Sequence, residues 1–168
     1  MSKPEKSEVR AYLKRSPLQI EVKFLTELSR SKTFDLVTID IPKWFSHVHE
    51  VKWNHANSEN GPSQIGACSE RECAIDGKIL TEEIVEYVQD QKYSYHADLS
   101  RSTLKMPIRN HFGSFTVDAA EYGSLVVWRQ YYQVPFWPLA SIIRWYMRDK
   151  MMKPAVRNLI NNFGGKLC

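Results

Sequence analysis

Between residues 48 and 134, six segments with the composition of β-strands follow one another with only short turns between them. They cover residues 48–54, 64–75, 78–88, 92–99, 107–119 and 125–134. The dipeptide Asp76-Gly77 is among the strongest signals for a short hairpin, and Tyr122-Gly123 marks another turn. Short hairpins join antiparallel neighbours, so the pattern predicts one antiparallel sheet built from consecutive strands.

A further strand and two short helices are predicted ahead of this run. Every second residue of the strand is apolar: Leu18, Ile20, Val22 and Phe24. This alternation is typical of a strand with one buried face. Ser29 or Ser31 can cap a helix over residues 33–37, and Asp40 can cap a second helix over residues 42–45.

Apolar residues spaced three and four apart predict a long amphipathic helix over residues 139–163, ended by Gly164-Gly165. Pro154 lies inside it and removes a backbone hydrogen bond, so we expect a kink or break at residues 152–153 and a more mobile segment beyond them. The predicted fold is α+β, a curved seven-stranded antiparallel sheet around this helix. It forms one domain over residues 17–168, preceded by a flexible tail at residues 1–16.

Composition narrows the class of protein. A chain of 168 residues is long enough to bury its own core, and 23 basic against 19 acidic residues give a net charge of +4, too small to indicate a nucleic-acid partner. Cys68 and Cys73 are expected on one strand with opposite orientations, which favours reduced thiols and a cytoplasmic protein. The charged N-terminal residues are unlike a secretory signal, and the longest apolar stretch, residues 134–147, is too short and too interrupted for a membrane span.

The sequence offers little to hold a cofactor. His47, His49 and His55 could ligate a metal, but their spacing fits no tight motif and surface histidines are the simpler interpretation. Gly164-Gly165-Lys166 lacks the spacing and the hydroxyl residue of a phosphate-binding loop. We therefore expect no metal, nucleotide or other cofactor.

Several short motifs occur in an order shared with a known family. Residues 34–37 with Asp40 and Trp44 are followed by Gly66, Arg71 and residues 80–84, and then by Tyr95 and residues 123–128 with Tyr132. Over residues 18–163 this order resembles the START-like helix-grip superfamily, in particular its polyketide cyclase/dehydrase and lipid-transport group. One departure is that Ser69 stands where family members often place an arginine, and the arginine here is Arg71.

The resemblance implies an internal cavity, and strand alternation indicates which side chains face it. The register that we assign as inward contains these residues: Leu80, Glu82 and Ile84; Tyr93 and Tyr95; His111, Gly113, Phe115 and Val117; Val126, Trp128, Gln130 and Tyr132. Arg129 then points outward. Aromatic and aliphatic walls with a few polar groups are what small-molecule sites show.

Two functions fit such a cavity. The first is binding or carriage of a small apolar ligand, such as a lipid, a quinone or a polyketide-like molecule. Its expected contacts are Tyr93, Tyr95, Phe115, Val126, Trp128, Tyr132, Leu139, Ile143 and Tyr146. The alternative is a cofactor-free cyclase or dehydratase, because a buried carboxyl group and a histidine, Glu82 and His111, can exchange protons near neutral pH. A satisfied Glu–Arg or Glu–Tyr contact, or a filled core without a cavity, is the structural alternative.

The C-terminal helix is rich in cations next to aromatic and methionine residues. The cations are Arg144, Arg148, Lys150, Lys153 and Arg157, beside Trp137, Trp145, Met151 and Met152. Such a face is usually solvated, but it also suits peripheral contact with an anionic membrane. We further expect Leu139, Ile143 and Tyr146 to pack over the sheet, so that the helix closes the pocket.

Overall fold

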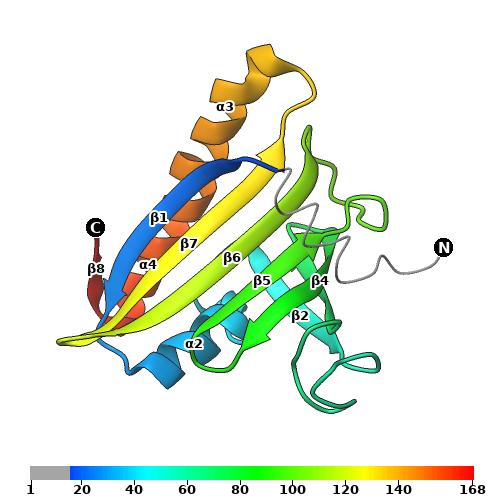
Figure 1. Ribbon diagram of the computed structural model, residues 1–168. Helices are drawn as coiled ribbons and strands as arrows, with labels where there is room; N and C mark the ends of the chain where they lie inside the picture. Colours follow the sequence, from blue (N-terminus) through cyan, green and yellow to red (C-terminus); the bar gives the residue numbers. More distant parts are fainter. Residues whose placement is uncertain (1–15) are drawn as a thin grey trace.

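The computed structural model describes residues 16–168 and shows a strongly curved antiparallel sheet with a long C-terminal helix across its concave side (Figure 1). The eight strands are β1 (Leu18–Thr26), β2 (Val48–Asn54), β3 (Glu70–Ile75), β4 (Lys78–Val88), β5 (Lys92–Ala97), β6 (Arg109–Ala120), β7 (Gly123–Gln133) and β8 (Gly165–Leu167). They lie in the order β2-β3-β4-β5-β6-β7-β1-β8. The α+β helix-grip prediction is therefore confirmed, with eight strands in place of seven.

The additional strand follows directly from the end of the last helix. Gly164 ends that helix as expected, with a φ of 81°, and Gly165 has a φ of 131°; both values favour glycine. A Cβ on Gly165 would lie 1.9 Å from the carbonyl oxygen of Leu25, so only glycine allows the close approach to β1. The chain then pairs with the free edge of β1, which the sequence pattern did not reveal.

The strand predicted over residues 64–75 is shorter, because residues 55–69 form a loop. The Ser69 hydroxyl accepts a hydrogen bond from the Gly66 backbone N–H (3.1 Å) and contacts His55 Nδ1 (3.0 Å), and these bonds hold the loop in a compact turn. Cys68 has a φ of 68° within the loop. The placement of Cys68 and Cys73 on one strand was therefore wrong, although all three cysteines are free.

Two short helical segments lie between β1 and β2. The first, α2 (Arg30–Thr38), begins after Ser29, whose hydroxyl accepts from the Lys32 backbone N–H. The second is a 3-10 turn, η1 (Ile41–Lys43), and the Asp40 side chain bonds Lys43 Nζ in place of capping it.

The C-terminal helix changes geometry along its length. A 3-10 turn, η2 (Trp137–Leu139), leads into α3 (Ala140–Trp145), then a π-helical segment, η3 (Tyr146–Met152), and finally α4 (Lys153–Phe163). Pro154 lies in the first turn of α4, where a missing N–H is tolerated. The irregularity expected at residues 152–153 is therefore spread over the preceding π-helical segment.

The core lies between the concave face of the sheet and α4, where Phe24, Val156 and Leu159 are fully buried. In contrast, α3 projects past the end of the sheet (Figure 1). Leu139 and Tyr146 are exposed, so the expectation that they pack over the sheet was wrong. Ile143 is half-buried and packs against the edge of the core. The tail expected at residues 1–16 lies outside the described residues except for Ser16, which is buried and donates to the Asn110 carbonyl.

Candidate ligand-binding site

An apolar cavity of about 90 Å³ lies between the sheet, η1 and the π-helical segment. Its aromatic wall consists of Trp44, Phe45, Tyr93, Tyr95, Phe115 and Trp128. Three of these rings form a stacked row across β5, β6 and β7, because Tyr93, Phe115 and Trp128 are direct partners in the strand register. The ring centroids are 5.3 Å apart for Tyr93 and Phe115 and 4.9 Å apart for Phe115 and Trp128. The sheet thus presents a flat, rigid face to the cavity.

A buried ion pair lies at one side of the cavity. Arg71 of β3 is the register partner of Glu82 of β4, and Arg71 Nε donates to Glu82 Oε2 at 2.5 Å. The Arg71 guanidinium is also within 4.9 Å of the ring centroid of Tyr95 and 5.4 Å of that of Tyr93. Burial alone lowers the pKa of Arg71, but the Glu82 carboxylate together with Tyr93, Cys73 and Tyr95 outweighs this effect, and the pKa is raised well above its usual value. Arg71 is therefore a permanent cation.

A chain of three polar side chains, which begins at Tyr95, also lines the cavity. Gln130 donates from Nε2 to the Tyr95 hydroxyl (3.0 Å), so its carbonyl oxygen faces His111 Nε2 at 2.6 Å. The hydrogen of the neutral imidazole must therefore lie on Nε2, and the buried His111 Nδ1 has no hydrogen-bond partner in residues 16–168. Burial lowers the pKa of His111, although the bond to Gln130 opposes the shift, so the ring is neutral at neutral pH. His111 thus offers one free acceptor.

Local backbone features set this arrangement. Asn110 has a φ of 47°, and the pairing of β6 with β7 shifts register between Arg109 and Phe112, so a bulge turns His111 inward. A Cβ on Gly113 would lie 2.1 Å from Tyr95 Cζ, so the glycine lets the tyrosine ring cross β6 toward Gln130. Burial raises the pKa of Tyr95 to about 12, which keeps its hydroxyl protonated.

A second, outer groove of about 510 Å³ continues from the cavity toward α3. The two spaces share five lining residues: Ile75, Leu104, Met106, Met147 and Met151. Three of these are methionines, whose unbranched side chains change rotamer easily. The shared residues therefore form a deformable passage between the inner cavity and the groove.

Most of the residues predicted for the site lie at one of these two spaces. Glu82, His111, Gln130 and the predicted aromatic contacts Tyr93, Tyr95, Phe115 and Trp128 line the cavity. Ile143 and Tyr146 line the outer groove. Val126 and Tyr132 are fully buried but line neither space, and Leu139 lies on the exposed side of η2. The inward register assigned to β4, β5, β6 and β7 is the one observed, and Arg129 points outward to Glu21.

Several groups that line the cavity were not predicted from the sequence. Arg71, Cys73 and Ile75 alternate with the polar Glu70 and Glu72, so the strand pattern contained the signal once its start at Glu70 is known. Met147 and Met151 also line the cavity, and their spacing of four residues is one that places side chains on the same face of a helix.

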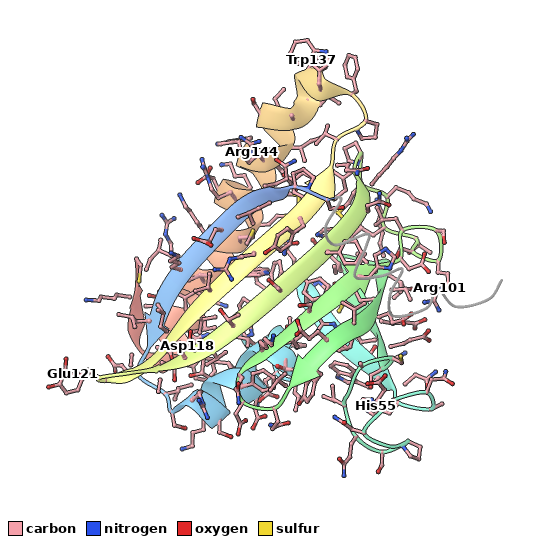
Figure 2. All side chains as sticks on the ribbon, viewed as in Figure 1. His55, Arg101, Asp118, Glu121, Trp137 and Arg144 are labelled. Atoms are coloured by element: carbon pink, nitrogen blue, oxygen red, sulfur yellow. The ribbon has the colours of Figure 1, made fainter. Side chains whose placement is uncertain are left out.

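The three histidines considered for a metal site do not meet at one point. His47 and His49 both contact the Asp76 carboxylate, at 2.8 and 3.0 Å. His55 lies in the loop before β3, away from α3 (Figure 2), and contacts Ser69. Residues 16–168 contain no group of three or more histidine, cysteine, aspartate or glutamate side chains arranged to hold a metal ion. In the same part of the chain, no helix is both long and apolar enough to cross a membrane.

Comparisons with solved structures agree with the fold. A protein from Thermobifida fusca is 18% identical with a TM-score of 0.68, and the match covers 86% of this chain and 92% of that chain. The di-domain ARO/CYC protein StfQ of the steffimycin biosynthetic pathway is 13% identical with a TM-score of 0.63, over 89% of this chain and 51% of StfQ. Ara h 8.0201 is 11% identical with a TM-score of 0.55, and the match covers 83% of this chain and 96% of that chain. At these identities the likeness shows the fold alone.

A search of curated proteins gives no significant match. The sequence does match a family model described as polyketide cyclase/dehydrase and lipid transport, over residues 19–164. That range contains all but the first residue of β1, the whole of β2 to β7, the cavity and the whole of the C-terminal helix. The chain therefore belongs to the family of polyketide cyclase/dehydrase and lipid-transport proteins.

Proposed function

We propose that this protein binds or carries a small apolar ligand, such as a lipid, a quinone or a polyketide-like molecule, that bears a polar oxygen. The observation that carries the proposal is the contrast inside the cavity. Its walls are aromatic and aliphatic, yet they include a permanent cation, Arg71, and the neutral ring of His111, whose buried Nδ1 has no hydrogen-bond partner in residues 16–168. A ligand oxygen beside these groups fixes orientation, while the stacked rings supply apolar contact.

The ligand must enlarge the inner cavity, because about 90 Å³ is below the range of roughly 300–1,000 Å³ that is usual for ligand pockets. Movement of Met147 and Met151 joins the cavity to the outer groove of about 510 Å³. The combined space suits an elongated molecule whose inner end contacts Trp128 and whose outer end lies against Ile143 and Tyr146.

A second candidate is a cyclase or dehydratase. Here His111 Nδ1 removes a proton from a carbon next to a substrate carbonyl, and Arg71 stabilises the enolate oxygen that forms. We favour binding, because the Glu82 carboxylate is paired with Arg71 and is not available to take a proton from a substrate.

Native mass spectrometry of protein purified without detergent tests the proposal directly. We expect one extra mass per chain, which organic extraction identifies as an apolar molecule. The emptied protein should then bind anilinonaphthalene sulfonate, with an affinity weakened roughly tenfold or more in Trp128→Ala because a buried aromatic wall is lost. Val127→Ala is the matched control, since Val127 lies on the opposite face of the same strand.

The two candidates give different results with a linear polyketide mimic. A carrier returns the mimic chemically unchanged after incubation. Multiple turnover to a cyclised or dehydrated product, lost in His111→Gln, would establish the enzyme instead. Absence of any bound molecule, together with equal dye affinity in Trp128→Ala and Val127→Ala, would show that the interior is a filled core.

A further inference from the structure

A cluster of exposed apolar side chains occupies the end of the molecule where the chain leaves β7. Six of the nine large hydrophobic side chains that are exposed within residues 16–168 lie in this one stretch. The cluster, called here the tip, consists of Phe136, Trp137, Leu139, Ile142, Trp145 and Tyr146. Trp137 is 82% exposed and Phe136 is 61% exposed. Figure 2 shows Trp137 at the end of the molecule opposite Glu121.

The tip is unlike an ordinary solvated helix face. Contiguous exposed apolar surface usually marks a contact with a partner or a membrane. Tryptophan and tyrosine combine an apolar ring with a polar edge, and they concentrate where hydrocarbon meets lipid headgroups. The tip contains three such residues within ten positions of the chain, at 137, 145 and 146.

Along the chain, the charges next to the tip are mainly positive. No aspartate or glutamate occurs from Tyr122 to Arg148. Arg144 bonds the neutral Gln19 side chain at 2.9 Å, and Lys150 Nζ lies 5.4 Å from the centroid of the Trp145 ring. The nearest acid along the chain, Asp149, is paired with both Arg148 and Lys153. Residues 144–153 therefore carry four cations against one anion, a net charge of +3.

The outer groove reaches the same surface. Ile142 and Tyr146 belong to the tip and also line the groove, which continues through Met147 and Met151 to the inner cavity. The surface expected to be membrane-active from sequence included Met151 and Met152, but Met152 is buried and Met151 lines the cavity. The contact surface is thus confined to η2, α3 and the start of η3.

We propose that the tip docks on an anionic lipid bilayer. Phe136, Trp137 and Trp145 enter the headgroup region, and Arg144 and Arg148 contact lipid phosphates. The mouth of the groove then faces the hydrocarbon, so an apolar ligand passes between membrane and cavity without crossing water. A second copy of the chain is a poorer occupant, because a two-fold contact would bring the cations of both tips together.

Vesicle co-sedimentation tests the proposal with the full chain. We expect binding to phosphatidylcholine vesicles that contain phosphatidylglycerol, and much weaker binding to phosphatidylcholine alone. Trp137→Ala/Trp145→Ala should lower the partition coefficient roughly tenfold or more, because two interfacial rings are lost. The control is Tyr122→Ala, which removes an aromatic that is 81% exposed at the opposite end of the sheet. That variant should bind as the unaltered protein does.

A second pair of variants tests the charge contribution. Arg144→Gln/Arg148→Gln should weaken binding to the anionic vesicles by about fivefold for each charge removed, and Lys32→Gln/Lys52→Gln, with the same loss of charge elsewhere, should not. Brominated lipid should quench tryptophan emission in the unaltered protein and much less in Trp137→Ala/Trp145→Ala.

Three results would overturn the proposal: no sedimentation with anionic vesicles, equal binding to both lipid compositions, or equal binding by the tip variant and Tyr122→Ala. A dimer in analytical ultracentrifugation that Trp137→Ala disperses, without vesicle binding, would assign the tip to a second copy. Binding of anilinonaphthalene sulfonate in lipid-free solution distinguishes this proposal from the proposed function. Trp137 and Trp145 line neither the cavity nor the groove, so Trp137→Ala/Trp145→Ala should leave the dye affinity unchanged.

Discussion

At the scale of single residues, the interior is organised around charges and acceptors that apolar walls isolate from water. Arg71 and Glu82 neutralise one another, and His111 is held neutral by burial. The strand register predicted Glu82 and His111 as inward residues from sequence. A satisfied Glu–Arg contact was one alternative predicted for Glu82, and the pair with Arg71 confirms it. The sequence could not identify Arg71 as the partner, because the loop over residues 55–69 obscured where β3 begins and hence which way Arg71 points.

Glu82→Gln should destabilise the fold by about 3–5 kcal/mol, because it leaves the buried Arg71 cation without its counterion. Urea unfolding at neutral pH measures the change. Glu86→Gln, also on β4, breaks the half-exposed pair with Lys92 of β5 and should lower the free energy of unfolding by no more than about 1 kcal/mol. A similar loss in both variants would mean that the buried pair contributes no more than a surface pair. Because the variant is less stable, any activity that it loses must be corrected for the fraction of Glu82→Gln protein that remains folded.

His111 should make stability depend on pH. Its folded pKa is lowered by burial, so below about pH 6.5 the unfolded chain takes up a proton that the folded protein resists. The free energy of unfolding should therefore fall between about pH 7.5 and 5.5 and remain level above that window. His96, whose pKa is also lowered by burial, contributes with the same sign. His111→Gln should reduce the slope, measured as urea midpoints across this range; an unchanged slope would contradict the assignment.

At the scale of elements, the C-terminal helix has two functionally different halves. Ala155, Val156 and Leu159 anchor α4 in the core, whereas α3 is exposed and the π-helical segment lines the cavity. Periodicity predicted the helix and its end at Gly164 correctly. It could not predict which half is anchored. Pro154 indicated a less stable backbone in α4, but the buried side chains of α4 hold that half in the core.

Amide hydrogen exchange should accordingly be fastest in α3, intermediate in the π-helical segment and slowest in α4, the reverse of the order that Pro154 alone suggests. Saturating anilinonaphthalene sulfonate should slow exchange at residues 146–152, because a bound molecule contacts Met147 and Met151. Mass spectrometry of peptic fragments resolves the three segments. Equal protection along residues 140–163, unchanged by the dye, would show a rigid helix that takes no part in binding.

At the scale of the whole molecule, the sequence predicted the succession of strands because each hairpin is local. The six consecutive strands β2 to β7 are neighbours in the sheet, and turn residues such as Asp76-Gly77 mark their boundaries. Long-range features were harder to predict. The pairing of β8 with β1 and the projection of α3 past the sheet depend on which surfaces remain free after the strands have assembled.

The position of β1 between β7 and β8 also constrains how the chain folds during synthesis. Glu21 on β1 and its partner Arg129 on β7 are 108 residues apart, so β1 emerges from the ribosome long before the strand that it pairs with. Pairings of such separation form slowly, because a long loop must close first. Until then β1 exposes Ile20, Val22 and Phe24 on an unpaired strand. The nascent chain thus depends on rapid completion or chaperone protection to avoid aggregating through that strand.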